Sequence, residues 1–257
     1  MSADDGFEGD RPTQAVALKS DVAKKLPLFA FGLLEQGDAF DVAMGAPPKD
    51  GRQRAEAYFA AKVKVKAYGA APAIVKLVQD ELVGQLLGNV QLIARLTAGR
   101  PIEIDLVPEN KSMAAYGYPK RASAQAAGLF WDHPTWPAAR IGLLVRALKN
   151  ERALVIHEMA HAIQRLAFTQ PEQDLIYQLM LPTYRSRSWV DEVFAIYSER
   201  EFVNAFTERE GHAPGVYGMA RQRWDERHVF TRFVRNLYHP HKPLAGSTRS
   251  IPKGLLG

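Results

Sequence analysis

A helix with polar residues at its centre is the feature that most constrains the fold of this chain. The segment ALVIHEMAHAIQRL, residues 153–166, has the apolar period of a helix that lies in a hydrophobic core. His157, Glu158 and His161 interrupt its apolar run. Burying a glutamate without a partner is costly, so two satisfied core histidines beside a stray glutamate explain this pattern poorly. We therefore expect the three polar side chains to act together.

The spacing of these residues is typical of a zinc site. Residues i and i+4 of a helix share one face and lie about 6 Å apart, so His157 and His161 can bind one ion through their imidazoles. Glu158 leans toward the same ion without ligating it, and it can accept a proton from a zinc-activated water. The motif therefore predicts one Zn²⁺ per chain, with Glu158 as the general base.

A catalytic zinc ion needs a third protein ligand. The motif with a third histidine is absent, because Gln164 and Ala167 occupy its glycine and histidine positions. Cysteine ligands, disulfides and thiol catalysis are excluded, because the chain contains no cysteine. We predict Glu192 as the third ligand, since it lies inside the apolar helical pattern of WVDEVFAIYSE. Asp191 and Glu199 are alternatives that the spacing does not exclude.

Two motifs together indicate a family. HEMAH at 157–161 and DEVFAIYSE at 191–199 resemble the gluzincin metallopeptidases, most closely the anthrax-lethal-factor-like branch. The resemblance covers residues 102–206 and implies a zincin-like fold that hydrolyses peptide bonds. It assigns metal ligation to His157, His161 and Glu192, general-base catalysis to Glu158, hydrogen bonding to the oxyanion to Tyr184, and close packing under the metal to Ala195.

The chain departs from the family pattern at one position. The family often has an acid four residues after the glutamate ligand, where it orients a histidine, but Ile196 stands there in this chain. Either Glu199 or a backbone carbonyl orients the histidine, or the register differs. The resemblance also implies that a strand edge before the zinc helix pairs with an extended substrate. AAGLFW and ARIGLLV are the candidates for this edge, although plain core strands explain both segments equally well.

The remaining patterns predict an α+β fold, a zincin-like domain with a small mixed or antiparallel sheet preceded by a mainly helical region. We expect helices over Arg52–Tyr68, Ala73–Thr97, Glu151–Phe168, residues 171–182, Trp189–Phe206 and residues 220–238. The expected strands are PIEIDLVP, AAGLFWDHP and ARIGLLVRAL. The predicted regions are a disordered 1–20, a mainly helical 21–100, a metallopeptidase domain over 101–238 and an extended tail over 239–257.

Two further groups have weaker functional interpretations. Trp131, His133 and Trp136 cluster in FWDHPTW, where a packed turn with His133 at the surface is favoured over a substrate cleft. His228 could serve as a second oxyanion donor, but a lone histidine on a basic helix is more often a surface residue.

Charge and hydropathy limit the partners. The net charge is +5, and residues 221–257 hold eight Lys and Arg against two acidic residues. Such an excess can bind nucleic acid, but the apolar face of the same helix predicts packing onto the domain, so nucleic acid is not favoured. The polar N-terminus and the lack of a long apolar run predict a cytoplasmic protein with no membrane partner, and export by a route other than Sec stays open.

We therefore expect a zinc-dependent endopeptidase that acts on a protein or peptide. One alternative is a regulatory zincin-fold protein that binds nucleic acid or a protein partner through its basic C-terminal helix. Another is a zinc hydrolase with a non-peptide substrate, because water activation is common to both chemistries.

Overall fold

Helices and a small sheet alternate along the first half of the chain, and helices follow in the second half. The computed structural model describes residues 49–184, 186–202 and 229–240, and the side chains of residues 179, 182–184, 229 and 230 are not described. Its elements are α2 (Gly51–Lys62), β1 (Val63–Lys66), α3 (Pro72–Leu86), α4 (Val90–Ala98), β2 (Ile102–Val107), η2 (Met113–Tyr116), α5 (Lys120–Ser123), β3 (Gly128–Trp131), β4 (Ala139–Leu144), α6 (Val145–Leu148), α7 (Ala153–Leu166), α8 (Gln170–Tyr184), α9 (Arg187–Phe202) and α12 (Val229–Tyr238). The fold is thus mixed α+β and mostly helical, as predicted at this coarse level.

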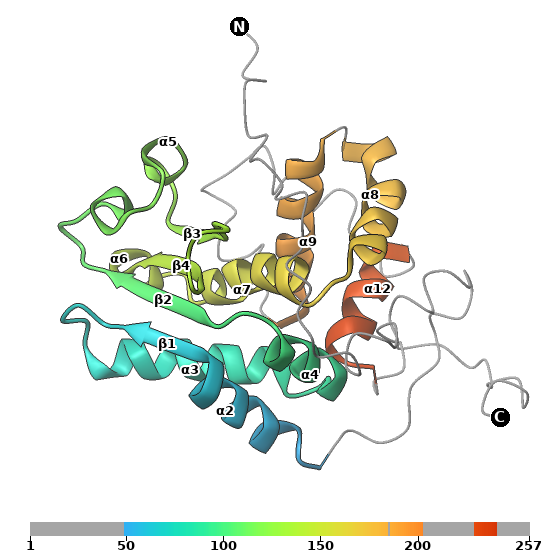
Figure 1. Cartoon of the computed structure of the whole chain (residues 1–257), viewed down its shortest axis with the longest axis horizontal. Helices are drawn as coiled ribbons and strands as arrows, with labels where there is room; N and C mark the ends of the chain where they lie inside the picture. Colours follow the sequence, from blue (N-terminus) through green and yellow to red (C-terminus); the bar gives the residue numbers. More distant parts are fainter. Residues whose placement is uncertain (1–48, 185, 203–228, 241–257) are drawn as a thin grey trace, which may run out of the picture.

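The four strands form one mixed sheet with the order β1-β2-β4-β3. The β1, β2 and β4 strands are parallel, whereas β3 runs antiparallel to β4 at the edge. In Figure 1, α7 lies between this sheet and the helices α8 and α9. ARIGLLV therefore contributes an interior strand, β4, and AAGLFW contributes the edge strand, β3.

Side chains on the two faces of the sheet pack into two separate hydrophobic clusters. Ile104 and Ile141 belong to the main hydrophobic core, which also contains the buried faces of α3, α7, α9 and α12. Val107 and Leu144 belong to a smaller cluster with Met113 and Tyr118. Because β3 continues the same alternation, one of its faces is directed at α7.

The predicted helix over Arg52–Tyr68 is wrong beyond Lys62. Residues Val63–Lys66 form β1, which pairs in parallel with Ile102–Asp105 of β2. The sequence VKVK alternates, but it follows the helix α2 directly, and pairing with β2 in the sheet decides that it is a strand. Since a strand lies between two helices, the predicted segregation of all strands after the first helices is also wrong.

The single helix predicted over Ala73–Thr97 is two helices, α3 and α4. They are separated at Gly88, where a Cβ would lie 2.3 Å from the carbonyl oxygen of Tyr238. Asn89 caps α4 by accepting a hydrogen bond from the Leu92 N–H at 3.0 Å, and it donates to the Leu237 carbonyl at 2.6 Å. The end of α12 therefore occupies the break, which the continuous apolar period did not reveal.

The other predicted elements agree in type with the structure, with different ends. Residues Val145–Leu148 form the short helix α6 rather than the end of a strand. Residues on both sides of position 100 contribute to one core. The predicted disorder over 1–20 and the part of the predicted helical region over 21–48 lie outside the described residues, as does the tail beyond residue 240. Residues 203–228, which include His228, the end of the predicted helix over Trp189–Phe206 and the start of that over 220–238, lie outside them as well.

The last helix packs onto the domain. Phe233, Val234, Leu237 and Tyr238 of α12 are buried, as the apolar face of this segment predicted. Among the described residues, no helix is both long enough and apolar enough to cross a membrane.

Candidate metal centre

The two motif helices, α7 and α9, bring the candidate ligands together. His157 and Glu158 on α7 are 6% and 5% exposed, respectively, whereas the Glu192 side chain at the start of α9 is 48% exposed. Ala160 and Ala195 are both fully buried, and such small side chains allow two helices to pack closely. The site is therefore buried on the α7 side and accessible on the Glu192 side.

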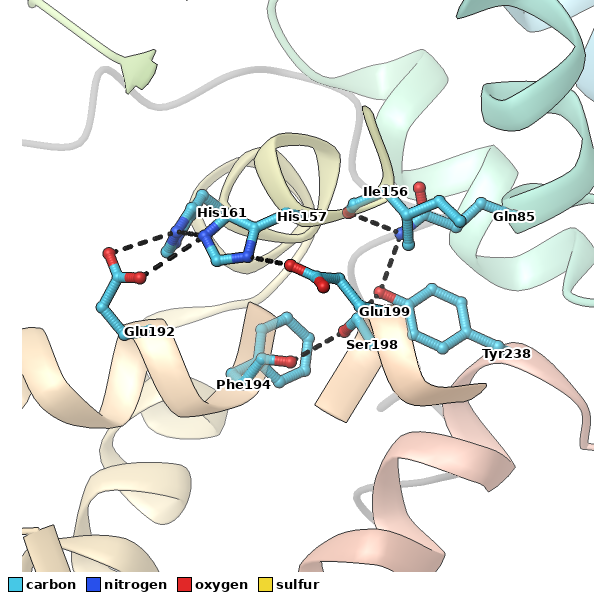
Figure 2. Close-up of polar contacts among 9 residues, drawn as sticks. All are labelled: Gln85, Ile156, His157, His161, Glu192, Phe194, Ser198, Glu199 and Tyr238. Atoms are coloured by element: carbon cyan, nitrogen blue, oxygen red, sulfur yellow. Dashed lines mark hydrogen bonds and ion pairs between the residues drawn. The ribbon is translucent and has the colours of Figure 1, made fainter. Parts of the chain in front are cut away.

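Three side chains converge at this point (Figure 2). The Nε2 atoms of His157 and His161 lie 3.2 Å apart. The carboxylate of Glu192 faces both rings, with Oε2 at 3.4 Å from His157 Nε2 and Oε1 at 3.6 Å from His161 Nε2. The structure thus brings together the three residues predicted as ligands, and their ligand atoms lie within 4.8 Å of one another.

The dimensions of this triangle can be compared with those of a metal site. In a tetrahedral zinc site with ligands at 2.0–2.1 Å, two ligand atoms lie about 3.3 Å apart. The observed separations of 3.2, 3.4 and 3.6 Å bracket that value. Two imidazole nitrogens and one carboxylate are also a donor set that catalytic zinc accepts. The residues therefore fit one divalent ion with little rearrangement.

Glu199 supports the first histidine from behind. Its Oε1 lies 2.5 Å from His157 Nδ1, on the opposite side of the ring from Glu192 (Figure 2). The Glu199 side chain is fully buried. When Nδ1 donates its proton to this carboxylate, Nε2 is left facing Glu192 and His161, where it could ligate an ion. Glu199 therefore orients the His157 ring, which Ile196 cannot do. Of the alternatives that the sequence left open for this role, the structure shows Glu199.

A chain of buried polar contacts fixes the helices behind the site (Figure 2). The Tyr238 hydroxyl donates to Ser198 Oγ at 3.0 Å, and Ser198 Oγ donates to the Phe194 carbonyl at 2.9 Å. Gln85 Nε2 donates to both the Ile156 carbonyl and the Tyr238 hydroxyl at 3.2 Å. These bonds join α3, α7, α9 and α12 next to Glu199, so they limit movement of the two motif helices relative to each other.

Burial and charge move the pKa values of the two histidines apart. Burial lowers the pKa of His157, but its hydrogen bonds with Glu192 and Glu199 outweigh burial and raise that pKa well above the ordinary value. Burial lowers the pKa of His161 to about 4. Without a metal, these shifts favour a protonated His157 between two carboxylates and a neutral His161.

Glu158 lies between α7 and the edge strand. A Cβ on Gly128 of β3 would lie 2.5 Å from Glu158 Oε1, so the carboxylate rests against the backbone of β3. The carboxylate also accepts a hydrogen bond from the backbone N–H of Phe130. Burial raises the pKa of Glu158 to about 7, and the charge of His157 opposes that shift. A carboxyl group with a pKa near 7 can both accept and release a proton at neutral pH.

The remaining predicted residues have separate places. Asp191 Oδ1 accepts hydrogen bonds from Gln164 Nε2 at 2.6 Å and from the Tyr177 hydroxyl at 2.8 Å, so it links α7, α8 and α9 instead of joining the cluster. Tyr184 ends α8, and its side chain is not described. Its predicted contact with an oxyanion therefore stays a prediction.

The FWDHPTW segment is a surface turn. His133 is exposed, and its ring contacts that of Trp136 at 5.8 Å while Nδ1 bonds to Thr135 Oγ1 at 2.8 Å. Trp131 packs against the smaller hydrophobic cluster. The favoured prediction of a packed turn is confirmed.

Gly128 and Phe130 are residues near the site that the sequence motifs did not indicate. A glycine inside a short strand is a signal for close approach by another group, and Gly128 shows this approach. Comparisons with protein-family models, curated proteins and solved structures give no match to this chain.

Proposed function

We propose that this protein is a zinc-dependent endopeptidase, a zincin-like enzyme of the gluzincin type. The observation that carries the proposal is the triangle of His157, His161 and Glu192, with the buried carboxylate of Glu158 beside it. The three ligands would hold one Zn²⁺. When bound, the ion would lower the pKa of water toward about 7 and polarise a carbonyl oxygen.

The protein's own residues would handle the proton. Glu158 would accept the proton of the attacking water and transfer it to the leaving amine. Burial raises the pKa of its carboxyl group to about 7, which suits both transfers. Glu199 holds the His157 ring in its ligating orientation throughout. Tyr184 is the proposed donor to the oxyanion.

The edge strand supports a peptide as the substrate. One edge of β3 pairs with β4, and no described strand pairs with its other edge. Glu158 contacts this strand, so an extended chain added along β3 would pass next to the general base. This arrangement favours peptides over the non-peptide substrates that the zinc chemistry alone would also permit.

A role in nucleic-acid binding finds less support. The apolar face of α12 is buried against the domain, and its Arg235 forms an ion pair with Glu201 at 3.2 Å. The helix is therefore part of the core structure in the described residues. Steep salt dependence of DNA or RNA binding would be the observation that revives this alternative.

Two measurements test the proposal. Metal analysis of protein purified without added metal is expected to give one zinc per chain, with marked loss in Glu192→Ala. Cleavage of a peptide library by the zinc-loaded protein is expected, with Glu158→Gln as the inactive control that keeps its zinc. A wild type that binds no zinc when zinc is supplied would exclude the enzyme, and cleavage that survives in Glu158→Gln would exclude its mechanism.

A further inference from the structure

The edge strand β3 and the helix α7 approach each other unusually closely at one residue. A Cβ on Gly128 would lie 2.5 Å from Oε1, 2.7 Å from Cγ and 2.9 Å from Cδ of Glu158. Real Cβ atoms essentially never come this close to another atom. Rotating the carboxylate would not relieve such a contact, because Cγ is involved as well. A side chain at position 128 would therefore require either the Glu158 side chain or the strand to shift.

The hydrogen bonds between β3 and β4 determine which backbone groups of β3 point away from β4. The Leu144 N–H donates to the Ala127 carbonyl at 2.9 Å, so Ala127 and the alternate residues after it bond to β4. Gly128 and Phe130 then direct their N–H and C=O groups away from β4, toward the other edge. The Phe130 N–H is the group that donates to Glu158. Glu158 therefore receives an outward-facing donor of the edge strand.

We propose that Gly128 and Phe130 are positioning residues for the Glu158 carboxylate: Gly128 leaves the space that it occupies, and the Phe130 amide holds it there. This inference rests on the proposed function for its catalytic consequence, but the contact itself does not. The other outward-facing groups of β3 are those that an added peptide strand would use. Glu158 is therefore held at the line along which such a peptide would run.

Comparing Gly128→Ala with Gly142→Ala distinguishes a contact with Glu158 from the general effect of adding a methyl group in a crowded place. Gly142 lies in β4, opposite Leu129 of β3. A Cβ on Gly142 would lie 2.9 Å from Tyr118 Cζ and 3.2 Å from Met113 Sδ, in the smaller cluster. Gly142→Ala is thus a crowded glycine-to-alanine change with no contact to Glu158.

A double-mutant cycle on the full chain tests the contact without any assay of activity. Gly128→Ala is expected to lower the melting temperature by about 5 °C. In a Glu158→Ala background, which removes the contacted atoms, the same change is expected to cost about 1 °C or less. Gly142→Ala is expected to cost the same in both backgrounds. Equal costs of Gly128→Ala in both backgrounds would overturn the inference, whether or not the protein cleaves peptides.

Kinetics of the zinc-loaded protein then test positioning. Gly128→Ala is expected to lower kcat about 100-fold with KM within about twofold and with zinc content unchanged, because the base is displaced while the ligands stay. Gly142→Ala is expected to keep the wild-type kcat per folded molecule. An unchanged kcat in Gly128→Ala would overturn the positioning role. Coupling in the cycle, combined with a zinc-loaded wild type that cleaves no peptide, would refute the proposed function and leave the Gly128–Glu158 contact standing.

Discussion

The contact between Glu199 and His157 leads to a quantitative prediction for zinc affinity. Glu199→Gln keeps the size of the side chain and an oxygen that accepts the Nδ1 proton, so it removes mainly the negative charge. Loss of such a supporting contact typically costs 10- to 100-fold in metal affinity, or about 1.4–2.7 kcal/mol. A full ion pair at about 4 Å and an effective dielectric of 20 is worth about 4 kcal/mol, which sets an upper bound. We expect about 10-fold for Glu199→Gln and about 100-fold for Glu199→Ala.

Competition for zinc against a chelator of known affinity measures this effect on the metal-free full chain. Glu201→Gln is the matched control, because Glu201 also lies on α9 but pairs with Arg235 at 3.2 Å and with His239 at 3.7 Å. This control is expected to keep wild-type affinity. Wild-type affinity in Glu199→Gln would refute the idea that Glu199 supports the ligand.

The pH dependence of the same measurement distinguishes charge from a general loss of structure. Zinc must displace the proton that Glu192 and Glu199 stabilise on His157, so wild-type affinity is expected to rise with pH. Removing the Glu199 charge lowers the pKa of His157 and weakens this competition. The affinity of Glu199→Gln is therefore expected to rise less steeply with pH, and the deficit is expected to be smaller in acid. A deficit that is the same at every pH would indicate a structural defect instead.

Two other predictions concern stability. The pKa of Glu158 is raised from 4.5 to about 7, so between these pH values the folded state holds a proton that the unfolded state has lost. The stabilisation from the protonated Glu158 is therefore complete below pH 4.5 and is lost as the pH rises through 7. With zinc removed, Glu158→Gln is therefore expected to be about 3 kcal/mol more stable than wild type at pH 8 and to show no such gain at pH 4.5, as measured by urea unfolding. Gly88→Ala is expected to lose about 1–3 kcal/mol in the same assay, because its Cβ would lie 2.3 Å from the Tyr238 carbonyl oxygen; wild-type stability would contradict the close packing of α12 at the break between α3 and α4.

The approach of His157, His161 and Glu192 was more predictable than the fold around them, for a physical reason. Within one helix, the i,i+4 spacing alone places His157 and His161 on the same face. The choice between Ile196 and Glu199 depends instead on how far α9 is displaced along α7, and that displacement is set by packing between helices. No spacing within a single helix determines this displacement. The partner of His157 and the approach of Gly128 to Glu158 therefore follow only from how the helices and the sheet pack together.

The errors in the fold have the same origin. The apolar period runs on through Leu86, Leu87 and Val90, yet the helix breaks there because the carbonyl of Tyr238, far away in sequence, occupies the space beside Gly88. Val63–Lys66 follows a helical pattern without interruption, but pairing with β2 makes it a strand. In both places a long-range contact overrides a local preference.

The charges at the site give the final reason to expect a cation there. Glu192 and Glu199 both contact His157, and Glu158 lies one residue away on the same buried helix turn. Three carboxylates thus surround two imidazoles, of which His161 is neutral because burial holds its pKa near 4. Without a metal, the protein limits this excess by keeping a proton on His157 and by raising the pKa of Glu158 to about 7. A divalent ion between the ligands would supply the missing positive charge, release the proton from His157 and leave Glu158 as the group that exchanges protons.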